Sequence, residues 1–71
     1  MEKNIERSQQ ARAVLEAYCT VKGEQFDTIE TEITDLVTAL LHLAHQEGLD
    51  AGSLCRMAQL HFTYETTPVE A

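Results

Sequence analysis

The sequence predicts an all-α protein, a three-helix bundle in which the second and third helices form a tight hairpin. Glycine and proline are scarce and stand where helices would end, and β-branched runs with strict alternation are absent. Apolar residues recur instead at helical spacing. Because 71 residues fit one domain at most, we expect a single helical domain over residues 1–71.

The first helix is expected over about residues 8–22, with a start as early as Ile5 left open. At about 100° per residue, one face collects the apolar side chains, and Arg12 and Glu16 fall on the other. Lys22 suits the negative end of the helix dipole, and Gly23 can adopt the left-handed conformation that closes a helix. The apolar face comprises Ala11, Val14, Leu15, Tyr18 and Cys19.

The second helix is expected over about residues 28–46. Asp27 is a suitable N-cap, and Glu30 follows it at the spacing of a capping box. The helix carries one continuous apolar stripe, which consists of Ile29, Ile33, Leu36, Val37, Leu40, Leu43 and Ala44. This stripe is the strongest amphipathic signal in the chain.

Gly48 should end the second helix, and Asp50 should cap a third helix over about residues 51–65, followed by a flexible tail over 66–71. The third helix has two apolar patches. We expect the first to pack on the second helix and to comprise Ala51, Leu54, Cys55, Ala58 and Phe62. The second, Met57, Leu60 and Tyr64, should meet the first helix, another subunit or a target. This surplus favours a homodimer over a monomer.

Charge is distributed unevenly. The net charge is −7, and the span between Lys22 and Arg56 holds seven carboxylates and no Lys or Arg. We expect an acidic partner-binding face formed by Glu30, Glu32, Asp35 and Glu47. Such a face favours basic protein partners and disfavours nucleic acid and anionic membranes. Carboxylates at the start of a helix are also stabilised by its dipole, so their acidity has a purely structural explanation as well.

The remaining reactive side chains predict neither catalysis nor a cofactor. His42 and His45 are three residues apart, but no third metal ligand is placed near them. His61 is expected at a core edge or a subunit seam, and Cys19 on an apolar face as an inert thiol. With two cysteines, no apolar run long enough for a membrane span and a polar start, we expect reduced thiols and a cytoplasmic location. A single Cys19–Cys55 bridge is the alternative.

Glu32 and Asp35 form an E-x-x-D pair, and Gly48-Leu49-Asp50 follows them. This combination resembles the MazG-like all-α nucleotide pyrophosphohydrolases, in which such a pair holds Mg²⁺. That family also has an E-x-x-E pair on the preceding helix, where this chain has Glu16 followed by Cys19. Half of such a site does not hold the metals that the reaction needs, so we do not expect an enzyme.

The stretch from Asp35 to Glu65 reads Asp-Leu-(x)3-Leu-Leu-His-Leu-Ala, then Gly-Leu-Asp, then Met-Ala-(x)2-His-Phe-(x)2-Glu. This pattern resembles short helical proteins of phages, plasmids and other mobile elements. The resemblance implies a genetic setting in which small acidic proteins often inhibit host defence, as anti-CRISPR proteins do. It implies no activity by itself.

Three functional hypotheses follow. The first is a small acidic inhibitor or regulator that occupies the basic surface of a partner protein or nucleoprotein complex. The second is a structural or assembly adaptor that binds through Met57, Leu60 and Tyr64. The third, a Mg²⁺-dependent pyrophosphohydrolase, is the least favoured.

Overall fold

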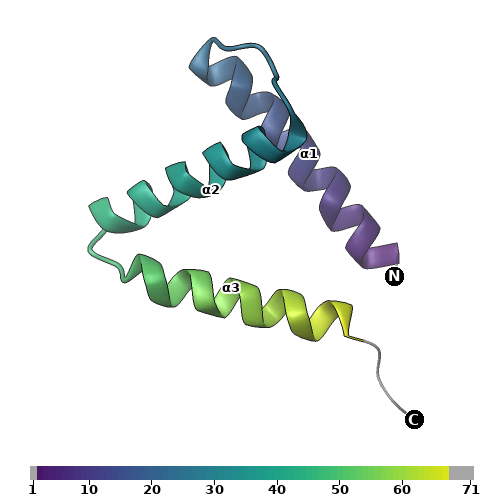
Figure 1. Cartoon of the computed structure of the whole chain (residues 1–71), viewed down its shortest axis with the longest axis vertical. Coiled ribbons are helices and arrows are strands. Elements are labelled where there is room, and N and C mark those ends of the chain that lie inside the picture. Colours follow the sequence, from purple (N-terminus) through teal and green to yellow (C-terminus); the bar gives the residue numbers. More distant parts are fainter. Residues whose placement is uncertain (1, 68–71) are drawn as a thin grey trace. The chain divides into compact units, whose positions relative to one another are not determined.

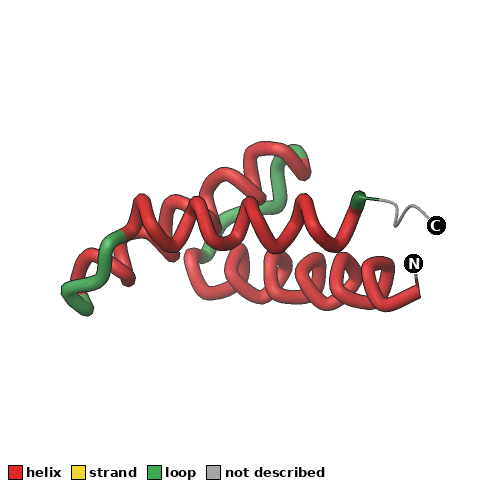
Figure 2. The backbone as a smooth tube through the Cα atoms, turned by 90° about the horizontal axis from the view of Figure 1, so that it is seen from below, coloured by secondary structure: helices red, strands yellow, loops and turns green. Residues whose placement is uncertain are grey.

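The computed structural model describes residues 2–67, which form three helices and no strand (Figures 1 and 2). The helices are α1 (Glu2–Lys22), α2 (Ile29–Gln46) and α3 (Ala51–Thr66), and the all-α prediction is confirmed. The chain divides into two compact units, residues 1–40 and residues 41–71. Most of the tail expected over 66–71, including Pro68, lies outside the described residues.

α1 begins six residues before the expected Ser8. The Ser8 hydroxyl donates a hydrogen bond to the Ile5 carbonyl at 2.7 Å, so Ser8 lies inside the helix. The residues before it are mostly Glu, Lys and Arg, which favour helices without needing an apolar face. An argument based on apolar periodicity therefore places the start too late.

α1 ends where expected, at Gly23, whose φ is 72°. The Gly23 amide donates to the Thr20 carbonyl, and the Glu24 amide donates to the Cys19 carbonyl, both at 3.1 Å. This pair of bonds is the Schellman motif, in which the left-handed residue turns the chain out of the helix.

The N-cap of α2 is Thr28 and not Asp27. The Thr28 carbonyl accepts the first helical bond, from the Glu32 amide at 3.0 Å, and its hydroxyl accepts from the Thr31 amide at 3.2 Å. Threonine caps helices nearly as well as aspartate. The predicted start of α2 is thus one residue early, and the role expected of Asp27 belongs to its neighbour.

The second unit contains the end of α2, a short connection and α3, and α2 and α3 contact one another as expected of a hairpin. Gly48, with φ 73°, closes α2 by a second Schellman motif, in which the Leu49 amide donates to the Ala44 carbonyl at 2.9 Å. The Asp50 carboxylate then accepts from the Ser53 amide at 3.0 Å and caps α3. Both roles were predicted from the sequence.

Little of the described chain is buried. The buried apolar side chains are Leu15, Cys19 and Ala44, and α3 has no buried residue. Ala51 is half-buried, but Leu54, Cys55 and Phe62 of the same predicted patch are exposed. Among residues 2–67, no helix is both long and apolar enough to cross a membrane.

The two glycines around Asp50 should respond oppositely to substitution. Gly48→Ala should lower the free energy of unfolding by about 1 kcal/mol, because alanine is strained at positive φ. Gly52→Ala should raise it by about 0.5 kcal/mol, because Gly52 is helical and glycine is less favourable than alanine inside a helix. The added Cβ would lie 3.4 Å from Arg56 Nη1 and Asp50 Oδ1, so it would fit without a clash. Urea denaturation measures both. A loss of stability in Gly52→Ala equal to that in Gly48→Ala would contradict this assignment.

Candidate functional site

Glu32 is the only buried charged side chain among the described residues, with 3% of its surface exposed. One carboxylate oxygen, Oε2, accepts from the Asp27 amide at 2.8 Å, and the other, Oε1, accepts from the Cys19 thiol at 3.1 Å. The carboxylate thus joins α1, the connection between the helices and the first turn of α2. These bonds stabilise its charged form and lower its pKa, the Asp27 amide contributing most.

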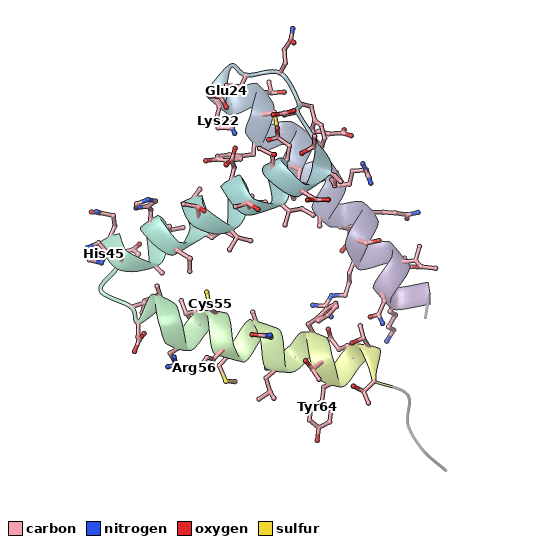
Figure 3. All side chains as sticks on the ribbon, viewed as in Figure 1. Lys22, Glu24, His45, Cys55, Arg56 and Tyr64 are labelled. Carbon is pink, nitrogen blue, oxygen red and sulfur yellow. The ribbon has the colours of Figure 1, made fainter. Side chains whose placement is uncertain are left out.

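Lys22 supplies the positive charge next to this carboxylate. Its Nζ lies 3.0 Å from Glu24, 3.6 Å from Asp35 and 3.8 Å from Glu32, and it also lies 4.6 Å from the centre of the Tyr18 ring. Figure 3 shows Lys22 and Glu24 together at the end of α1. The hydrogen bond to Glu24, with the charges of Asp35 and Glu32, raises the pKa of Lys22 to about 12.

The cluster also includes the buried thiol of Cys19. The hydrogen bond to Glu32, together with burial, raises the pKa of the Cys19 thiol, which disfavours the reactive thiolate. Both cysteines are free thiols, with Cys19 buried and Cys55 exposed. Within residues 2–67, no group of three or more His, Cys, Asp or Glu side chains is arranged to hold a metal ion. Lys22 lies close to both carboxylates of the E-x-x-D pair.

The acidic face differs from the one predicted. Glu30, Asp35 and Glu47 are exposed, but Glu32 is buried and cannot contact a partner directly. Asp35 is about half exposed and paired with Lys22. Of the four residues of the predicted face, Glu32 therefore lies in the interior, and the charge of Asp35 is partly neutralised by Lys22. Glu30, Asp35, Thr31 and Thr34 line a shallow hollow on the surface of α2.

The second apolar patch of α3 is exposed. Met57 is 49% exposed, Leu60 54% and Tyr64 82%. Figure 3 shows the Tyr64 ring projecting away from the ribbon of α3. All three histidines are exposed as well, including His61, for which a core edge or subunit seam was expected.

Sequence reasoning missed the Lys22–Glu32–Cys19 cluster, although two signals for it exist. Glu32 stands three residues after Ile29 and four before Leu36, so it borders the apolar stripe at helical spacing. Lys22 is the last cation before a long acidic span, so carboxylates nearby have one obvious partner. Each signal was visible, but neither says which of the three early carboxylates of α2 turns inward.

Comparison of the chain with models of protein families, with curated proteins and with solved structures finds no match. The resemblances to mobile-element proteins and to MazG-like enzymes therefore remain predictions.

Glu32 should make folding sensitive to acid. Because its pKa is lowered in the folded chain, its contribution to stability is present above about pH 4.5, the ordinary value, and is lost as the pH falls through the folded-state value. Wild type should therefore lose more stability than Glu32→Gln between pH 6 and pH 3. Melting temperatures followed by circular dichroism measure this loss.

Glu30→Gln is the matched control, because it removes the same charge from an exposed position of the same helical turn. It should keep the acid sensitivity of wild type. Equal acid sensitivity in wild type and Glu32→Gln would show that the charged form of the buried Glu32 carboxylate does not stabilise the fold.

Proposed function

We propose that this protein is an assembly adaptor that binds another protein through the exposed apolar patch of α3. The observation that carries the proposal is the exposure of Met57, Leu60 and Tyr64, which reaches 82% at Tyr64. Methionine and aromatic side chains are enriched at the centres of protein interfaces. Leaving them in water has no benefit for folding, since their burial is what would stabilise the chain.

The spacing of the patch defines the kind of partner. The three residues stand at positions i, i+3 and i+7 of one helix, the pattern of a helix that lies in an apolar groove. Ser53 falls on the same arc, and no charged residue does. The proposed partner therefore offers an uncharged, apolar groove of about two helical turns. This contact requires no basic surface.

A second candidate function is the acidic inhibitor of a basic partner. It is supported by the net charge of −7 and by the hollow lined by Glu30 and Asp35. Basic surfaces that hold phosphates would attract such a chain, and the association would weaken as salt rises. It ranks second because Glu32 is buried and Asp35 is paired with Lys22. A pyrophosphohydrolase activity has no supporting observation beyond the E-x-x-D pair.

Two double variants separate these functions in a pull-down from cells that carry the protein. Leu60→Ser with Tyr64→Ser should abolish capture of the partner, because both anchors are removed from the patch. Glu30→Lys with Glu47→Lys should leave capture intact. Glu32 and Asp35 are left unchanged because both contact Lys22, and reversing their charge would disturb the fold.

Gln59→Ser with Thr63→Ser is the control for the patch, since both residues are exposed on another face of α3. It should capture the partner as wild type does. Loss of capture in the charge-reversal variant, with retention in Leu60→Ser/Tyr64→Ser, would overturn the adaptor and support the acidic inhibitor. The same capture at 50 mM and 500 mM salt would count against the inhibitor.

A further inference from the structure

The first unit, residues 1–40, contains a hollow between α1 and α2 that the proposed function does not use. Its volume is about 240 Å³, and all of its lining residues belong to this unit. Its apolar lining includes the buried Leu15 of α1 together with Ile29 and Ile33 of α2, which are 36% and 50% exposed. Small-molecule sites in proteins share this make-up, in which apolar walls surround a few polar groups that orient the ligand.

Arg12 supplies the charge in this hollow. Of the described residues that line it, Arg12 is the only charged one, so the hollow is locally positive in a chain whose net charge is −7. Within the described part of the chain Arg12 makes no ion pair, although Glu16 follows it by one helical turn. A guanidinium without a partner, next to apolar side chains, suits a carboxylate that is joined to an apolar body.

The polar groups next to Arg12 narrow the kind of ligand further. The Ser8 hydroxyl already donates to the Ile5 carbonyl at 2.7 Å, so it can only accept another hydrogen bond. The side-chain amide of Gln9, which also lines the hollow, can donate one. A planar carboxylate matches the parallel N–H groups of a guanidinium. A ligand with several negative charges, such as a nucleotide, is disfavoured by the net charge of −7.

We propose that this hollow binds a free aliphatic carboxylate. The carboxylate accepts hydrogen bonds from the Arg12 guanidinium, and the hydrocarbon chain covers Ile29 and Ile33. The volume of about 240 Å³ holds about eight water-sized groups, at about 30 Å³ for each. A chain of about eight carbons, as in octanoate, therefore fits. The proposal concerns the first unit and does not rest on the function proposed for α3.

Titration of the isotope-labelled full chain with sodium octanoate, followed by two-dimensional NMR, tests the proposal. Octanoate should shift the amide signals of residues 8–15 and 29–33 and the Nε–H signal of Arg12, with a Kd of about 5 mM or below. From butanoate to octanoate, the affinity should rise by up to about fourfold for each added CH₂ group. The absence of a saturable shift, or shifts of equal size throughout α3, would overturn the proposal.

The variant Arg12→Gln separates the carboxylate contact from apolar binding. It should weaken octanoate binding at least about threefold, because it removes the charge that pairs with the carboxylate. It should leave the binding of octan-1-ol, which has no charge, as in wild type. Arg12 is exposed and glutamine favours helices about as well as arginine does, so the variant should keep the fold.

Lys3→Gln is the matched control, because it removes the same charge from an exposed position of α1 outside the hollow. It should bind octanoate as wild type does. Equal octanoate binding in wild type and Arg12→Gln would overturn the proposal. An equal loss of binding in Arg12→Gln and Lys3→Gln would overturn it too, since the effect would then come from the charge of the whole chain.

Discussion

The imbalance between buried and exposed apolar surface is the constraint on which the rest of this structure depends. Among the described residues, Leu15, Cys19 and Ala44 are buried, whereas fifteen large apolar side chains are at least 36% exposed. Burial of apolar surface is the main favourable term in folding, and a short chain has little of it to lose. Each feature of the fold can be understood as compensation for this shortage or as a consequence of it.

Within the first unit, polar contacts supply stability where few apolar side chains are buried. The Glu32 carboxylate binds the Cys19 thiol and the Asp27 amide, and Lys22 neutralises the charge beside it. A buried carboxylate is costly unless its oxygens are satisfied, and here each oxygen accepts a hydrogen bond. The cluster fixes the start of α2 against the end of α1.

The exposed apolar side chains differ in kind between the two helices. Those of α2 are Ile, Val and Leu, whereas the α3 patch combines Met57 and Tyr64 with Leu60. Methionine and aromatic side chains suit an interface that adapts to its partner, so the α3 patch has the composition expected of the proposed contact.

Local signals made much of the fold predictable. Gly23, Gly48 and Asp50 have the roles expected of them, because capping depends on a few neighbouring residues. The start of α1 was misplaced because its first residues are mostly polar helix formers, which give no apolar pattern. The N-cap of α2 was misplaced because Asp27 and Thr28 are adjacent and both suit that position. The burial of Glu32 was not predictable from charge patterning, because it depends on contacts with residues 13 positions away. The exposure of Met57, Leu60 and Tyr64 was left open for the same reason.

The most direct test of this account is a double-mutant cycle on the contact between Cys19 and Glu32, measured by urea denaturation of Cys19→Ala, Glu32→Gln and the double variant. If polar contacts stabilise the first unit in place of a larger core, the double variant should lose less stability than the sum of the two single losses, by at least about 0.5 kcal/mol. Additive losses would show that this contact does not stabilise the fold, and would contradict the central claim.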